Sequence, residues 1–201
     1  MSETTMQIAL LPAAATDQSA LANLIQFYEY DLSELDGADV DEHGRFSHAR
    51  IDSCRAEVDC HPFLIQADSL LTGFALIKRR SLLHTPAEGH TVTDFFVLRR
   101  FRRQGLGRAA AMALFDRFPG PWEVASCARN VPAHVFWRSV IDRYTAGRYA
   151  ETWFQTPVWH GPVHSFIAPT PAQSPYPKPL TPLVPMCADR PIDSTDLDVG
   201  G

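Results

Sequence analysis

The chain has 201 residues, of which 45% are hydrophobic and 20% are charged. These values are close to those of an average globular protein and argue against a fibrous, wholly disordered or membrane-spanning chain, while the length suits a single domain. Asp and Glu (23) outnumber Lys and Arg (18), which gives a net charge of −5 and predicts no general attraction to nucleic acid or to an anionic membrane.

The first half of the chain predicts both strands and helices. Residues 6–11 predict a strand, and Thr16 or Asp17 could cap a helix whose apolar side chains follow helical spacing. A polar connection is expected over 33–44. The next expected elements are a short helix and three strands, over 49–58, 62–66, 72–77 and 91–98.

The second half predicts a strand-helix alternation. An apolar helical stripe over 104–118 ends at Pro119 and Gly120, and one or two late strands are expected to be interrupted by Pro157 and Pro162. This order of elements predicts an α/β domain over residues 5–167. The other elements expected here are a strand over 122–127, a helix over 132–144 and the late strands over 153–166.

The end of the chain has a different composition. Half of the 16 prolines follow residue 168, and the last residues are acidic or Gly. Such a segment buries too little apolar surface to form a core, so residues 168–201 are predicted to be a proline-rich, disordered tail.

The cysteines and two late histidines suggest no metal site. The four cysteines have no C-x-x-C spacing, which predicts free thiols and a cytoplasmic location, and Cys127 is expected to be a small buried residue. His160 and His164 have a metal-like interval, but Gly161 and Pro162 disfavour a helix there. Two solvent-facing histidines are therefore expected.

An arginine-rich turn joins the strand over 91–98 to the next helix. Five arginines lie between residues 99 and 108, together with Gly105 and Gly107. A helix start leaves about four backbone N–H groups unpaired and carries partial positive charge, and glycines let a phosphate approach those groups. The turn therefore predicts a polyphosphate site. The alternative is that the two glycines only allow the chain to turn and bind no ligand. It lacks both the P-loop pattern and the third glycine of a dinucleotide fingerprint.

This turn resembles that of the GNAT superfamily of N-acetyltransferases. The family pattern Q/R-x-x-G-x-G/A is met at every defined position by residues 102–107. The later signature N-x-x-A-x-x-aromatic-aromatic resembles the segment that begins at Asn130 and ends at Trp137. The resemblance spans roughly residues 6–167, and its specific motifs lie between residues 94 and 137.

The resemblance implies an α/β fold with a mixed, mostly antiparallel sheet that is flanked by helices and splayed open at its central strands to hold acetyl-CoA. The pyrophosphate would lie on the amides of residues 103–108. Backbone groups of Phe95 and Val97 would bind the pantetheine arm, and Asn130 would hold it from the other wall. The cofactor-binding residues implied are Phe95, Phe96, Val97, Arg102, Arg103, Gln104, Gly105, Leu106, Gly107, Arg108, Asn130, Ala133, Phe136 and Trp137.

The resemblance also implies direct transfer of an acetyl group to a primary amine of a small-molecule or peptide acceptor. Asp94 is the candidate general base, with capping of the strand end or pairing with an arginine as its alternative use. Many relatives have a Tyr that protonates the thiolate where this chain has Trp137, whose indole is no usable acid and whose favoured use is core packing. Tyr144 lies about 10 Å further along the helix, too far to replace it.

The acceptor side is less well defined. Tyr28 and Asp31 are candidate contacts because aromatic and acidic side chains suit a cationic amine, and an ordinary surface role is the alternative. A module that binds or senses acyl-CoA in the same cleft, without efficient turnover, is the alternative to an enzyme. The sequence is silent on oligomeric state, and a homodimer is considered because dimers are common among similar proteins. No metal, nucleic acid or membrane partner is expected.

Overall fold

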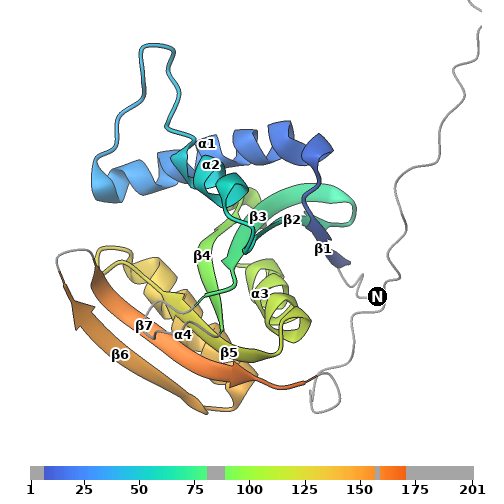
Figure 1. Ribbon diagram of the computed structural model, residues 1–201, viewed down its shortest axis with the longest axis vertical. Coiled ribbons are helices and arrows are strands. Elements are labelled where there is room, and N and C mark those ends of the chain that lie inside the picture. Colours follow the sequence, from blue (N-terminus) through green and yellow to red (C-terminus); the bar gives the residue numbers. More distant parts are fainter. Residues whose placement is uncertain (1–6, 81–88, 157–158, 171–201) are drawn as a thin grey trace, which may run out of the picture.

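The structure is a computed structural model that describes residues 7–80, 89–156 and 159–170. A seven-stranded sheet forms the centre of this part of the chain, in the order β1-β2-β3-β4-β5-β7-β6 (Figure 1). Neighbouring strands are antiparallel except β4 and β5, which run parallel. The strands are β1 (Ile8–Pro12), β2 (Cys60–Ala67), β3 (Leu70–Lys78), β4 (His90–Val97), β5 (Gly120–Ala125), β6 (Tyr149–Gln155) and β7 (His160–Ala168).

Helices cover both faces of the sheet. Figure 1 shows α1 and α2 on one side of β2, β3 and β4, whereas α3 and α4 lie on the other side. Short 3₁₀ turns precede α1 and follow β4. The helices and turns are η1 (Ala15–Asp17), α1 (Gln18–Asp36), α2 (Ala49–Ala56), η2 (Arg99–Phe101), α3 (Leu106–Arg117) and α4 (Val131–Thr145).

Helix α1 is longer than the sequence pattern predicts. Its apolar stripe buries Leu21, Leu24 and Ile25 against the sheet, as the helical spacing requires. The helix ends at Gly37, which adopts a left-handed conformation (φ +74°) and donates its N–H to the Ser33 carbonyl at 2.9 Å. The prediction that the connection begins at residue 33 is therefore wrong by one helical turn.

The core is divided by the sheet because side chains alternate between its faces. Phe74, Leu76 and Phe96 point toward α1 and pack with its buried leucines. On the opposite face, Phe115 and Trp122 are fully buried in the cluster that α3 and α4 cover. The central strands are thus apolar on both faces, which is typical of an α/β protein.

The late strands are longer than expected. Strand β7 continues through Pro162, which lies opposite Trp153 of β6. The Pro162 carbonyl accepts from the Ser126 N–H at 3.0 Å, and Ser126 lies just beyond the end of β5. The N–H that proline lacks therefore falls outside the β5–β7 pairing, and no hydrogen bond between these two strands is lost. Ala168, expected to begin the tail, is the buried last residue of β7. The tail residues 171–201 lie outside the described part of the chain.

Candidate functional site

The sheet opens between its two parallel strands. Strand β5 pairs with β4 only at His90, Thr91 and Val92, whereas β4 continues to Val97 with β3 on its other side. Strand β5 instead pairs along its full length with β7. In the described part of the chain, residues 93–97 therefore have no neighbouring strand on the β5 side, and this edge is open to an extended ligand.

The arginine-rich turn lies at the end of this open edge. Gly105 precedes α3 with φ +83°, a conformation that only glycine adopts readily. A Cβ added at Gly105 would meet Arg108 Nη2 at 3.6 Å and nothing else within 4 Å. The start of α3 is therefore accessible, and its unpaired amides and dipole can bind an anion.

The side chain of Arg102 holds the arginine-rich turn in place. Its Nε donates to the Val97 carbonyl at 2.7 Å, and its Nη2 pairs with Asp31 of α1. Arg99 donates to the same carboxylate at 2.9 Å. The prediction assigned Arg102 to the cofactor and Asp31 to the acceptor, but in this structure the two side chains bind each other and hold the turn against α1.

The other predicted residues of the turn divide into structural and accessible ones. Gln104 donates to the Arg100 carbonyl at 2.7 Å, and the side chain of Leu106 is buried in the core. A Cβ added at Gly107 would lie 3.4 Å from the ring of Phe136, so this glycine also lets α3 approach α4. Arg100, Arg103 and Arg108 are exposed and form no ion pair with the described residues, although the Arg100 guanidinium lies over the ring of Phe101.

Aromatic side chains line the opening on the α3–α4 side. The ring of Phe95 stacks on Phe136 at a centroid distance of 5.8 Å and meets the edge of Trp137 at 5.1 Å. Trp137 is only 5% exposed, which confirms its predicted packing in the core. Asn130 Oδ1 accepts from the backbone N–H of Ala133 at 3.1 Å and caps α4. This side chain therefore already has a structural role beside its predicted contact to pantetheine.

A polar cluster occupies the opposite face of β4. Asp94 is buried, and its Oδ1 accepts from Arg50 Nη1 at 3.1 Å. Arg50 Nε donates to Glu29 at 2.6 Å, and its guanidinium lies over the ring of Tyr28. Burial and the nearby Asp94 carboxylate raise the pKa of Tyr28, so its phenol stays protonated. The alternative use of Asp94, pairing with an arginine, is thus present in the structure.

Arg50 is the member of this cluster that the sequence analysis missed. Its neighbours in the sequence give no motif, and the segment between α1 and α2 carries it to Asp94 from 44 residues away. The available signal was indirect: a carboxylate on a strand that is buried on both faces requires a cationic or hydrogen-bonding partner. The cluster connects α1, α2 and β4.

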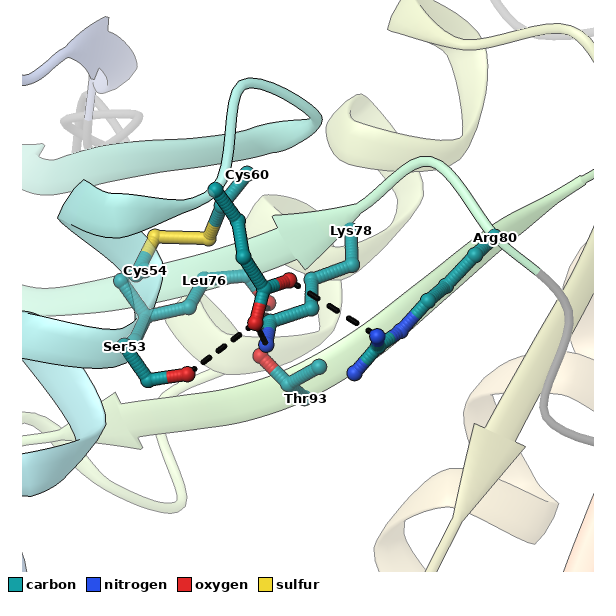
Figure 2. The surroundings of a disulfide bond; sticks show 8 residues. Ser53, Cys54, Cys60, Leu76, Lys78, Arg80 and Thr93 are labelled. Carbon is teal, nitrogen blue, oxygen red and sulfur yellow. Dashed lines mark hydrogen bonds and ion pairs between the residues drawn. A yellow bond between two sulfur atoms is a disulfide. The ribbon is translucent and has the colours of Figure 1, made fainter.

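The cysteine prediction is wrong for one pair. Cys54, near the end of α2, and Cys60, at the start of β2, form a disulfide with a Cα–Cα distance of 5.2 Å (Figure 2). Beside it, Lys78 donates to Glu57 at 2.7 Å. The argument from free thiols to a reducing compartment therefore fails for this pair. Cys127, expected to be buried, is exposed because β5 ends two residues before it.

His164 also differs from its prediction. It has no exposed surface and lies in β7 beside Glu151, whereas His160 is exposed as expected. Burial lowers the pKa of His164, and the Glu151 carboxylate acts in the opposite direction. His160 is the first residue of β7, whereas His164 lies further along the strand beside His134 of α4, which the short sequence interval could not reveal.

Comparison with known proteins identifies the fold through structure alone. No family model matches the chain, and no curated protein matches it. Among solved structures, the ribosomal-protein-S18-alanine N-acetyltransferase of Escherichia coli aligns with a TM-score of 0.53 at 15% identity, over 85% of this chain and 99% of that one. A protein assigned to the GNAT family from Desulfovibrio desulfuricans gives 0.53 at 10% identity, over 80% and 99%. The chain has the GNAT fold.

A third neighbour with the GNAT fold carries a ligand. Mycobacterium smegmatis RimJ, in complex with CoA-disulfide, aligns with a TM-score of 0.53 at 16% identity, over 81% of this chain and 85% of that one. The predicted fold class, a mixed and mostly antiparallel sheet flanked by helices and splayed at its central strands, is confirmed. Within the described residues, no helix is both long and apolar enough to cross a membrane.

Proposed function

We propose that the protein is an acetyl-CoA-dependent N-acetyltransferase that transfers the acetyl group directly to a primary amine. The observation that carries this proposal is the open edge of β4 after Val92, which leads to the accessible start of α3. An extended pantetheine arm and a pyrophosphate need these two features in this order. The folding unit proposed for this activity is residues 5–167, with Ala168 completing β7.

The chain's own groups would hold the cosubstrate in two places. The amides at the start of α3 would bind the pyrophosphate, and the exposed Arg103 and Arg108 would add charge-assisted contacts. The backbone of Phe95 and the N–H of Val97 would bind the pantetheine arm, because Arg102 already occupies the Val97 carbonyl. That N–H would then stabilise the negative charge that develops on the thioester oxygen. Acetyl-CoA supplies the activated acyl group.

Asp94 is the proposed base, and it acts within the cluster on the α1 face. Arg50 occupies Oδ1 and holds the carboxylate beside Tyr28. An amine that enters from this side would meet Asp94 directly or through water. Tyr28 borders the same space and stays a proposed acceptor contact. Because Arg99 and Arg102 bind the Asp31 carboxylate, Asp31 is proposed to affect the site by holding the arginine-rich turn in position.

No side chain is assigned as general acid. Trp137 is buried in the core, and the hydroxyl of Tyr144, in the same core cluster, donates to Asp116 of α3 at 2.9 Å. The CoA thiolate would therefore leave unprotonated or take a proton from water. The same observations favour the second candidate function, an acyl-CoA-binding or sensor module that uses the same cleft.

Calorimetric titration with acetyl-CoA, followed by a thiol-release assay with a panel of primary amines, distinguishes the two candidates. Small-molecule amines and peptides with free N-termini or lysines cover both acceptor classes. Binding with turnover of any amine supports the enzyme, and binding without turnover across the panel supports the sensor. Absence of binding contradicts both. A proposed homodimer is checked on the same samples by light scattering.

A further inference from the structure

Three side chains of metal-ligand type meet between α4 and the β6–β7 hairpin. They are His134 of α4, Glu151 of β6 and His164 of β7, and one ligand atom from each lies within 4.8 Å of the other two. His134 Nε2 is 3.4 Å from Glu151 Oε1, and His164 Nε2 is 3.1 Å from Glu151 Oε2. The elements that supply them are separate in sequence, so the fold itself brings the three together.

One histidine of this cluster, His134, has an unpartnered ring nitrogen, whereas His164 Nε2 shares a hydrogen bond with Glu151 Oε2 at 3.1 Å. His134 Nε2 is buried and has no hydrogen-bond partner among the described residues, despite its short distance to the carboxylate. His164 has no exposed surface, and its ring centroid lies 5.6 Å from that of His134. A buried ring nitrogen without a partner is unfavourable, and a cation between the two rings would remove the deficit.

We propose that His134, Glu151 and His164 bind one Zn²⁺ ion, with a water molecule as the fourth ligand. Tetrahedral zinc with bonds of about 2.0–2.1 Å places its ligand atoms about 3.3 Å apart. The two histidines lie 3.4 Å and 3.1 Å from different oxygens of the Glu151 carboxylate, Oε1 and Oε2, so this group faces both rings. One ligand atom from each residue lies within 4.8 Å of the other two, so the three must draw together by at most about 1.5 Å to bind one ion. His134 can supply that movement because its side chain is 24% exposed on the surface of α4.

The nearest competing charge is Arg138. Its Nε lies 3.5 Å from Glu151 Oε2, and 62% of its side chain is exposed. Arg138 can therefore turn into solvent when a cation arrives, at little cost. The bound ion fastens α4 to the β6–β7 hairpin, on the side of the sheet opposite to Asp94. The proposal does not depend on acetyl transfer.

Zinc binding is tested on the full chain with its purification tag removed and with Cys127→Ser and Cys187→Ser in the background, so that no free thiol competes. After treatment with a chelator and dialysis, calorimetry with Zn²⁺ alone should show one ion per chain. Co²⁺ should give the visible absorption bands of a low-coordinate site. Glu151→Gln and His134→Ala should each weaken binding at least tenfold. His160→Ala, an exposed histidine on β7, is the matched control and should bind as the parent does.

Both test substitutions change partly exposed side chains and leave the buried His164 in place, so the fold should survive, as circular dichroism can verify. Equal zinc affinity in Glu151→Gln, His134→Ala and the parent would overturn the proposal. So would the absence of saturable binding at one equivalent. In either case the three side chains form only an ion-paired cluster.

Discussion

Arg50 Nη1 lies 3.1 Å from Asp94 Oδ1, so the carboxylate proposed as the base is held by a guanidinium from a helix 44 residues earlier in the chain. The same guanidinium binds Glu29, whose side chain is only 10% exposed. Arg50 therefore connects α2 to α1 and to β4. Arg50 therefore helps to hold the proposed base beside Tyr28.

Arg50→Ala should destabilise the fold, because Asp94 and Glu29 would both lose a charged partner while staying buried. The expected loss is about 2 kcal/mol in the free energy of unfolding. It stays below that of a fully buried pair because the Arg50 side chain is 38% exposed. Urea unfolding measures the change. Arg55→Ala is the matched control on the same helix, since its pair with Asp52 is exposed, and it should change stability very little. Equal effects would contradict the structural role of Arg50.

Reduction of the Cys54–Cys60 disulfide should lower the melting temperature. The bond closes a short loop with a sequence separation of 6 and restricts the unfolded chain. The chain-entropy relation gives about 2 kcal/mol for such a loop, or about 4–8 °C for a domain of this size. Scanning calorimetry with and without dithiothreitol measures the shift. The double variant Cys54→Ser and Cys60→Ser should melt at the lower temperature both with and without dithiothreitol. Cys127→Ser should show the same shift in melting temperature as the parent. A reductant-insensitive parent would show that the bond contributes no stability.

Gly105→Ala should lose acetyl-CoA affinity by more than tenfold. The new Cβ lies at the accessible start of α3, and the φ of +83° strains any other residue by about 1 kcal/mol. Gly44→Ala separates the two effects, because Gly44 has a similar φ of +71° with nothing within 4 Å. Gly44→Ala should lose comparable stability and keep its affinity for acetyl-CoA. Titration calorimetry measures the affinity of both variants, and thermal unfolding measures their stability. Unchanged affinity in Gly105→Ala would remove the phosphate assignment of the turn.

Acidification should destabilise the protein partly through His90. Burial, with Arg79 as a further cause, lowers the pKa of this imidazole, which lies between Phe118 and Trp122. The native state keeps His90 neutral to a lower pH than the unfolded chain, which takes up a proton below about pH 6.5. The contribution to stability is thus complete above that pH and is lost as the pH falls through the lowered native value.

Urea unfolding at pH 7.5 and pH 5.5 gives the measurement for His90. His90→Phe keeps an aromatic ring in place and does not titrate, so it should lose less stability than the parent over this interval. The exposed His43→Gln should follow the parent. An identical loss in His90→Phe would show that the acid sensitivity has another source.

The strand end, the positive φ of Gly105 and the helix start of the arginine-rich turn could be predicted because their signals are local, while its phosphate site stays a prediction. A strand end, glycines and a helix start lie within a few residues of one another, and their conformation follows from those residues. Trp137 was likewise placed in the core by its position on an apolar helix face. The α/β class followed from the order of the elements, and the splayed, mostly antiparallel sheet followed from the resemblance to the GNAT superfamily.

The missed features depend on contacts between distant segments. The Cys54–Cys60 bond depends on how close α2 ends to the start of β2, and no spacing rule expresses that distance. The burial of His164 depends on which side of β7 faces α4, and the sequence does not place α4 relative to that strand. The Arg102–Asp31 pair spans 71 residues. Long-range pairing of this kind is set by packing and cannot be derived from local patterns.

The most direct test of the central claim is thermal unfolding with acetyl-CoA and, separately, with S-acetylpantetheine, which lacks the phosphates. At 100 times its dissociation constant, acetyl-CoA should add about 2.7 kcal/mol, which raises the melting temperature by about 5–10 °C. At the same concentration S-acetylpantetheine should shift it far less, because the start of α3 would then have no anion to bind. No shift with millimolar acetyl-CoA, or equal shifts with both ligands, would contradict the account.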